Sequence, residues 1–297
     1  MKTVRQRAYA KLNLFLDITG TDNGFHLIDT VVTTVDLFDV VILTSRKDKK
    51  VVLKTGGSLY SITEAPDNNA YKAASLFIDT FSTCGVDITL KKNIPVGSGM
   101  GGSSADIAAV LNGMEKLYRT GKDLKPLADK LGSDSGYMLT GGWARLKGRG
   151  EIVEPLDINA KLHFLVITAE GGVNTSKCYA EYDAINEQKP AVSAEGAIAA
   201  IKGDLDPSRF YNALYAPAAI INPKVREAYD FISGLSPRFT LMSGSGSSVF
   251  GVFDTVELCQ WAQAKAARYY KNVFVLQSLS VKELADPPFF AKNPFSL

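Results

Sequence analysis

Cysteine and histidine are scarce in this chain, with three cysteines and two histidines among 297 residues. The cysteines, Cys84, Cys178 and Cys259, are odd in number and lack the close spacing of metal ligands. These counts exclude a disulfide-stapled fold and a cysteine–histidine metal site. Each cysteine lies beside apolar residues, so we expect all three to fill the interior of a protein in a reducing compartment.

Long apolar runs and a strong net charge are also missing. No stretch is long enough to span a bilayer, and no apolar N-terminal run marks secretion. The net charge is only +2, so charge gives no basis for binding nucleic acid or an anionic membrane. We therefore expect a cytoplasmic protein that binds neither, and the length suggests about two domains.

The lysine of a P-loop is missing from the most glycine-rich stretch. Residues 95–106 read PVGSGMGGSSAD, and no lysine follows Gly102. Glycine allows positive φ and a close approach to a ligand. Apolar residues then recur at helical spacing from Ile107 to Tyr118, with Ser103 or Ser104 as the expected N-cap. Because a glycine loop at a helix N-terminus offers N–H groups and a positive dipole end, the stretch predicts a phosphate-binding loop.

Two other interpretations of this loop stay open. Gly97, Gly99 and Gly102 literally match the dinucleotide fingerprint Gly-x-Gly-x-x-Gly. That fingerprint directly follows a strand, and an acidic residue ends the next strand about 20 positions later. Here residues 93–95 intervene and a turn at 120–123 replaces that strand, so a hydride-transferring enzyme is the weaker alternative. The stretch could also be a surface loop before a well-capped helix, although such loops rarely need this many glycines.

Strand and helix patterns are interspersed along the chain, which predicts an α+β fold. Residues 3–19 alternate as a half-buried strand that places Lys11 and Asn13 on its second face, although a lone strand lysine is more often solvent-exposed. Other extended segments are expected at 30–35, 39–44, 51–53, 86–91, 142–146, 163–167, 249–253 and 273–276. Helices are expected at 69–81, 107–118, 124–131, 176–185, 194–201, 223–233 and 256–269. A soft boundary near residue 155 divides the chain into domains 1–155 and 156–297, and the last dozen residues should be irregular.

Three separated motifs agree in order and spacing with a known family. They are residues 10–16 (AKLNLFL) followed by Gly24-Phe25-His26, the glycine loop, and residues 241–250 (LMSGSGSSVF). The glycine loop resembles the ATP-phosphate loop of the GHMP kinases, which include galactokinase and the homoserine and mevalonate kinases. Within that superfamily, the first motif is similar to the 4-diphosphocytidyl-2-C-methyl-D-erythritol kinase family, and the similarity spans nearly the whole chain.

The resemblance implies a GHMP-kinase fold with a ribosomal-S5-like N-terminal domain, a ferredoxin-like C-terminal domain and an active site in the cleft between them. It implies that Asp134 is the catalytic aspartate and Lys11 the lysine beside it. ATP would be bound by the loop and by a helix that flanks adenine, at Pro95, Val96, Gly97, Ser98, Gly99, Met100, Gly101, Gly102, Ser103, Ser104, Ala105, Asn69 and Lys72. The substrate, a small alcohol that carries cytidine diphosphate, would be bound by Asn13, Phe25, His26, Thr175, Gly244, Ser245 and Gly246. Mg²⁺ is expected with ATP, without a visible motif for its ligands, in a monomer or homodimer.

Some alternatives remain at this point. Without the other motifs, Asp134 would be a turn or N-cap residue, and residues 243–248 a hairpin connection. Relatives usually continue the aspartate as Asp-Val-Pro, whereas Ser135 and Gly136 follow it here. Phosphorylation of another small alcohol, such as homoserine or mevalonate, therefore stays open, as does a non-catalytic homologue that binds nucleotide.

Overall fold

The computed structural model describes residues 1–55, 60, 63–185 and 189–285. The chain forms two compact units, each made of several segments. Unit 1 comprises Met1–Ala10, Leu37–Val96 and Gly101–Thr140, and unit 2 comprises Lys11–Asp36, Gly97–Met100 and Gly141–Leu297. The units interleave along the chain instead of dividing at residue 155, because strands β1 (Thr3–Asp22) and β2 (Phe25–Ser45) continue from one into the other. That residues 1–155 bind ATP stays a prediction.

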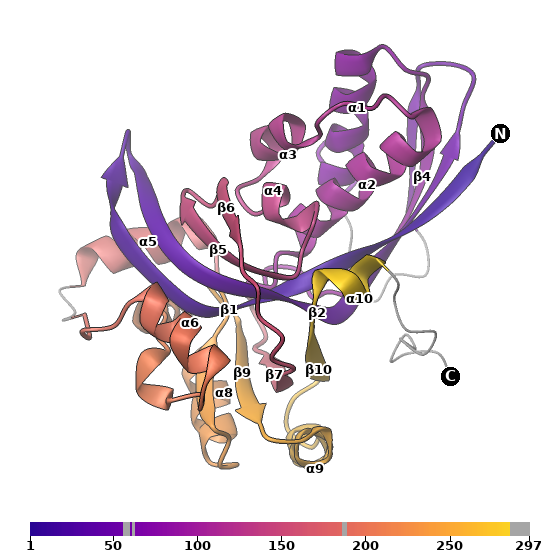
Figure 1. Ribbon diagram of the computed structural model, residues 1–297. Coiled ribbons are helices and arrows are strands. Elements are labelled where there is room, and N and C mark those ends of the chain that lie inside the picture. Colours follow the sequence, from indigo (N-terminus) through magenta and orange to yellow (C-terminus); the bar gives the residue numbers. More distant parts are fainter. Residues whose placement is uncertain (56–59, 61–62, 186–188, 286–297) are drawn as a thin grey trace. The chain divides into compact units, whose positions relative to one another are not determined.

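Unit 1 is a small sheet packed with helices (Figure 1). Strand β4 (Val86–Lys91) runs antiparallel to the second half of β2, from Val40 opposite Lys91 to Ser45 opposite Val86. Strand β3 (Val51–Thr55) pairs with β4 in parallel, and helix α1 (Asn69–Phe81) lies in the crossover that a parallel pair requires. The remaining helices are α2 (Gly102–Tyr118), α3 (Lys125–Leu131) and α4 (Ser135–Met138).

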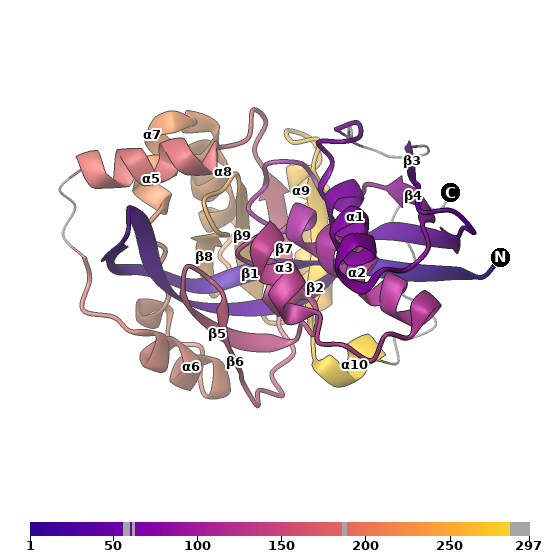
Figure 2. The same ribbon diagram turned by 90° about the horizontal axis from the view of Figure 1, so that it is seen from above.

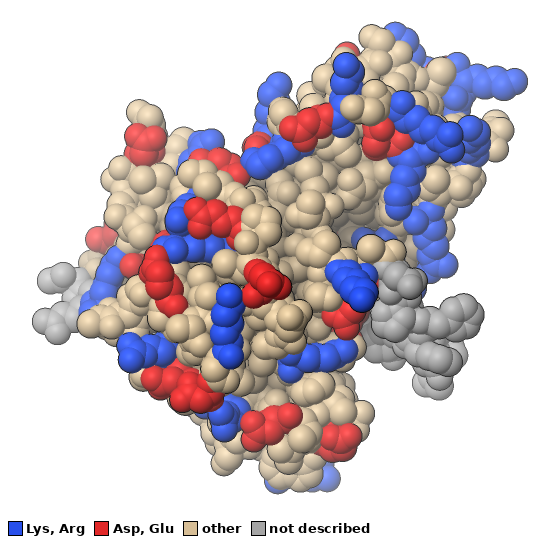
Figure 3. Space-filling view, viewed as in Figure 1, with Lys and Arg blue, Asp and Glu red and all other residues tan. Residues whose placement is uncertain are grey.

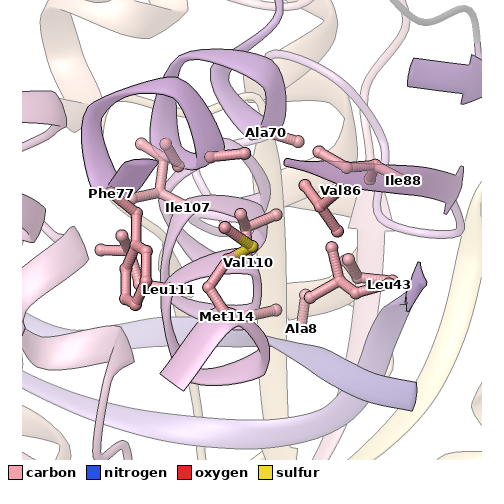
Figure 4. Packing of buried hydrophobic residues seen from close by; sticks show 14 of the residues in the cluster. Ala8, Leu43, Ala70, Phe77, Val86, Ile88, Ile107, Val110, Leu111 and Met114 are labelled. Atoms are coloured by element: carbon pink, nitrogen blue, oxygen red, sulfur yellow. The ribbon is translucent and has the colours of Figure 1, made fainter. Parts of the chain in front are cut away.

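The core of unit 1 fixes the position of α2. Figure 4 shows Val110 and Met114 of this helix among side chains of α1 and the strands, such as Phe77 and Ile88. Helix α1 begins where the Asn68 side chain accepts a hydrogen bond of 2.8 Å from the N–H of Ala70. Because this packing runs along the buried face of α2, it also holds the start of the helix, to which the glycine loop leads.

Unit 2 contains a second, antiparallel arrangement of strands. Strand β7 (His163–Thr168) lies between β9 (Ser248–Phe253) and β10 (Val273–Leu279), and β8 (Phe239–Met242) pairs with β9. The first half of β2 pairs with β5 (Trp143–Gly148), which pairs with β6 (Ile152–Pro155). The helices are α5 (Thr175–Ala184), α6 (Ala194–Lys202), α7 (Tyr215–Ile221), α8 (Pro223–Ser233), α9 (Val256–Ala266) and α10 (Val281–Ala285). Helices α5 and α7 lie side by side (Figure 2).

Most of the expected elements are present, and three expectations are wrong. The segments 30–35 and 39–44 belong to one strand, β2. Residues 10–16 of β1 are buried on both faces, because further elements cover the face that carries Lys11 and Asn13. Cys84 is exposed in the connection between α1 and β4, whereas Cys178 and Cys259 are buried as expected. The expectation for the last dozen residues lies outside the described residues. Within the described part of the chain, no helix has the length and apolar character needed to cross a bilayer.

Candidate active site

The glycine loop has a backbone that side chains would disturb. Gly97, Gly99 and Gly101 have φ values of 67°, 75° and 72°, in the left-handed region that favours glycine. Gly101 is the N-cap of α2 and provides no side-chain cap. The expectation that Ser103 or Ser104 caps this helix is therefore wrong, since both lie inside its first turn. A helix start without a side-chain cap keeps its first N–H groups available for an anion.

Within unit 2, the carbonyl groups of residues 97–100 accept hydrogen bonds, whereas three N–H groups of the same residues have no acceptor in the described part of the chain. The carbonyls of residues 97, 98 and 100 accept backbone hydrogen bonds of 3.3, 3.0 and 3.0 Å from Ser247, Ser248 and Lys11. The carbonyl of Gly99 accepts a bond of 3.1 Å from the Ser243 hydroxyl. Among the described residues, no acceptor binds the N–H groups of residues 97–99. The loop is thus held by its acceptors and presents donors, as a phosphate site requires.

Lys11 and Asn13 lie together on β1, as the alternation predicts, but in the interior. Their side chains are only 4% and 3% exposed. The Lys11 ammonium donates a 2.5 Å hydrogen bond to Asn13 Oδ1, and Asn13 Nδ2 donates to the Thr30 hydroxyl at 2.9 Å. Burial of an ammonium is costly without acceptors. Lys11 is therefore buried and hydrogen-bonded in the interior, and it is not one of the solvent-exposed lysines that are common on strands.

The loop between β8 and β9 completes this part of unit 2. It is the connection of an antiparallel hairpin, so that interpretation of residues 243–248 is correct as far as geometry goes. The Ser243 hydroxyl donates to Asn13 Oδ1 at 3.3 Å, and the hydroxyls of Ser245 and Thr175 lie 3.0 Å apart. A Cβ added to Gly244 would lie 3.4 Å from the Lys11 ammonium nitrogen. The structure therefore brings the predicted residues Lys11, Asn13 and Thr175 next to this loop, which itself contains the predicted residues 244–246.

One residue of this arrangement was missed from the sequence. Asn212 is buried, and its side-chain amide donates hydrogen bonds of 2.7 and 2.9 Å to the carbonyls of Met242 and Gly244. It fixes the hairpin loop from the side of residues 211–214. No local pattern marks this asparagine, because its partners are about 30 positions away in the chain.

Phe25 and His26 have different surroundings at the start of β2. The His26 ring stacks on Tyr179 of α5 with a centroid distance of 4.7 Å, and its Nε2 lies 2.8 Å from Asp183 Oδ1. The Phe25 ring is 55% exposed, with the Arg149 guanidinium 4.8 Å from its centre. Tyr179 and Asp183 were not among the predicted site residues. A signal for them was present in the sequence, because they follow Thr175 at intervals of four residues and so share its face of helix α5.

Asp134 lies in unit 1, in a segment beside the first turn of α2. A Cβ added to Gly132 would lie 3.3 Å from the Ser104 hydroxyl and 2.8 Å from the Ser135 hydroxyl, so the two segments are close neighbours. Asp134 precedes helix α4, but its side chain makes no capping hydrogen bond there. The N-cap interpretation therefore accounts for its position and not for its carboxylate.

Gly136, which stands where relatives usually have the proline of Asp-Val-Pro, has a packing reason. A Cβ added to Gly136 would lie 2.5 Å from Asp129 Oδ1, and Asp129 also binds the Lys125 ammonium at 2.6 Å. Glycine lets the carboxylate of α3 approach the backbone of α4. The glycine at position 136 therefore has an explanation within unit 1, without reference to a substrate.

The predicted adenine-flanking residues divide into one that contacts the loop and one that does not. Asn69, the first residue of α1, donates a side-chain hydrogen bond to the Ser103 hydroxyl in the first turn of α2. Lys72 is half exposed, and its ammonium lies 3.9 Å from Asp67 at the edge of ion-pair distance.

Within the described residues, no group of three or more histidine, cysteine or acidic side chains could hold a metal ion. Mg²⁺ held mainly by nucleotide phosphates needs few protein ligands, so the Ser104 hydroxyl fits such a role.

The comparisons with known proteins agree with this geometry. The family described as GHMP kinases N terminal domain matches residues 68–144, which contain the glycine loop and Asp134. A 4-diphosphocytidyl-2-C-methyl-D-erythritol kinase of Clostridium perfringens is 33% identical over 95% of this chain and 100% of its own length. This chain belongs to the 4-diphosphocytidyl-2-C-methyl-D-erythritol kinase family. A crystal structure of 4-(cytidine 5'-diphospho)-2C-methyl-D-erythritol kinase superposes with a TM-score of 0.81 at 28% identity, over 93% of this chain and 100% of that one.

Membership in this kinase family settles the fold class and the kind of reaction. The expected α+β GHMP-kinase fold is confirmed, and the chain is an ATP-dependent small-molecule kinase. The hydride-transferring alternative is therefore wrong. A homoserine kinase from Cytophaga hutchinsonii superposes with a TM-score of 0.67 over 94% of this chain and 95% of that one. At 19% identity it shares the fold alone.

Proposed function

We propose that this chain transfers the γ-phosphoryl group of ATP to the 2-hydroxyl of 4-diphosphocytidyl-2-C-methyl-D-erythritol. The observation that carries the proposal is the identity of about one third to kinases of this name along nearly the whole chain. The glycine loop supports it, because its N–H donors are presented while its carbonyls are held. The pathway is the non-mevalonate route to isoprenoid precursors, in the cytoplasm, by a monomer or homodimer that requires neither nucleic acid nor membrane.

The roles of the predicted residues follow from the needs of phosphoryl transfer. An acceptor hydroxyl must be held in line, and charge on the transferred group must be neutralised. Asp134 takes the proton of the hydroxyl, and Lys11 stabilises negative charge on the transferred group. The amides of residues 97–105 bind the triphosphate, with Asn69 and Lys72 beside adenine. Mg²⁺, accompanied by the Ser104 hydroxyl, supplies further charge neutralisation when bound.

The cytidine end of the substrate is bound by residues of unit 2. Phe25, which is exposed, stacks on the pyrimidine. His26 binds the polar edge of the base, oriented by Tyr179 and Asp183. Thr175 and the amides of residues 244–246 bind the polar groups that follow the base, since the Thr175 and Ser245 hydroxyls already meet there.

A panel of acceptor alcohols tests the proposed substrate. We expect ADP release with the cytidine diphosphate alcohol and none above background with homoserine, mevalonate or galactose. Turnover with homoserine or mevalonate alone would overturn the substrate assignment and keep the kinase. ATP binding without ADP release from any of the four would show a nucleotide-binding homologue instead.

Replacing Phe25 by alanine tests the cytidine contact. Because stacking of a base on an aromatic ring contributes about 1–3 kcal/mol, KM for the cytidine substrate should rise roughly tenfold or more. KM for ATP should stay within about twofold, because the substitution removes a contact to the cytidine substrate and none to ATP. Ile152→Ala is the matched control, because Ile152 is also an exposed apolar residue of unit 2, 49% exposed. A rise in KM for ATP alone would contradict the stacking role.

A further inference from the structure

Among the described residues, most ion pairs have at least one partner that is well exposed, whereas one cluster in unit 1 is almost fully buried. On the face shown in Figure 3, Lys and Arg side chains mix with Asp and Glu, and pairs such as Lys147–Glu154 are 36% and 46% exposed. In unit 1, Asp39, Lys92 and Asp106 form a cluster in which no side chain is more than 8% exposed. The Lys92 ammonium donates to Asp106 Oδ2 at 2.7 Å and to Asp39 Oδ2.

The cluster holds the chain on both sides of the glycine loop. On the entry side, Asp39 Oδ1 accepts hydrogen bonds from the N–H groups of Asn93 at 2.5 Å and Ile94 at 2.8 Å. These residues directly precede Pro95. On the exit side, Asp106 is the fifth residue of α2. A Cβ added to Gly102, its first residue, would lie 3.3 Å from the Lys92 ammonium nitrogen. One lysine thus connects strand β2, the loop entry and the loop exit.

Stability is a poor reason for such a cluster. Desolvation of buried charges cancels much of their attraction, so buried ion pairs are often replaced by apolar residues without loss of stability. Burial raises the pKa of Asp106 to about 8, against the opposing effect of Lys92 and with the added effect of Asp39. Burial also raises the pKa of Asp39, in spite of the Lys92 charge. What the geometry does provide is a fixed separation between two backbone segments.

We propose that Asp39, Lys92 and Asp106 are positioning residues of the nucleotide site: they hold the entry and exit of the glycine loop so that its amides converge on the phosphates of ATP. This inference rests on the proposed role of that loop. It predicts that the cluster contributes to nucleotide affinity although none of its side chains contacts the nucleotide. The alcohol substrate, bound by other residues, should be unaffected.

The triple variant Asp39→Asn/Lys92→Met/Asp106→Asn tests this role, because it removes the bridge and leaves no unpaired buried charge among the three residues. The dissociation constant of a non-hydrolysable ATP analogue, measured by titration calorimetry, should rise about tenfold or more. KM for the alcohol should stay within about twofold. The melting temperature, measured on the same samples, should change little. The variant Asp39→Asn, which keeps the pair of Lys92 and Asp106, carries the same expectation if the triple variant does not melt cooperatively.

Leu117→Ala is the matched control, because Leu117 is a buried core residue at the far end of α2. It should lower the melting temperature and leave the affinity for the ATP analogue unchanged. A folded cluster variant with unchanged affinity would overturn the inference, as would an equal loss of affinity in Leu117→Ala. Wild-type protein that binds the analogue but does not phosphorylate the cytidine alcohol would refute the proposed substrate and leave this inference standing.

Discussion

Asp134→Asn should lower kcat by about 10²–10⁴-fold, the usual contribution of a positioned general base. Asparagine keeps the size of the side chain but cannot accept the proton of the attacking hydroxyl. The segment that carries Asp134 lies beside the first turn of α2, as the contacts between residues 132, 104 and 135 show. The substitution therefore changes the chemistry at this position and little of the local packing.

The binding of ATP separates this effect from a structural one. If Asp134 acts only on the acceptor hydroxyl, the dissociation constant for ATP should stay within about twofold while kcat falls. Asp129→Asn is the matched control, because it makes the same chemical change in the neighbouring helix α3, where Asp129 binds Lys125. That variant should retain most of its activity. A kcat for Asp134→Asn equal to that of the control would remove the general-base role.

Local patterns in the sequence predict the elements well and their surroundings poorly. Helices 69–81 and 223–233 begin and end where the sequence analysis expects them. The length of β2 was missed because its two halves lie in different units, and a two-residue periodicity does not show where a strand crosses between them. Helix α4, with four residues, is too short for a periodic signal.

The candidate site shows the same division. The type and spacing of residues in the glycine loop predicted a phosphate-binding loop, and the resemblance of the separated motifs to a known family predicted kinase chemistry with roles for Lys11 and Asp134. They did not reveal that Lys11 is buried beside Asn13, because burial depends on strands and loops that are far away in the sequence. Asn212 and the Asp39–Lys92–Asp106 cluster were missed for the same reason, since their hydrogen bonds join residues separated by 14 to 55 positions. Even the unusual Gly136 is explained only by a contact with Asp129.

The same dependence on tertiary contacts makes Gly99→Ala the substitution of the loop with the largest expected effect. Two costs apply to it. At a φ of 75°, any side chain costs roughly 1–2 kcal/mol relative to glycine. In addition, the new Cβ would lie 2.1 Å from the Ser243 carbonyl oxygen and 2.9 Å from that of Gly246, whereas Cβ contacts under 3.0 Å essentially do not occur. The loop and the hairpin connection must therefore separate by about 1 Å, a displacement that can cost a hundredfold in rate.

Gly121→Ala carries the first cost alone, because Gly121 has a φ of 67° and no neighbour within 4 Å of an added Cβ. Both variants should lose roughly 1–2 kcal/mol of unfolding free energy from backbone strain alone. Only Gly99→Ala should lose about a hundredfold in kcat/KM for ATP, since only there must the amides that face the phosphates move. Denaturant unfolding and steady-state kinetics on both proteins decide the matter. If the two variants retain equal activity, residues 97–99 do not bind the nucleotide, and the phosphates of ATP must be held by another part of the chain.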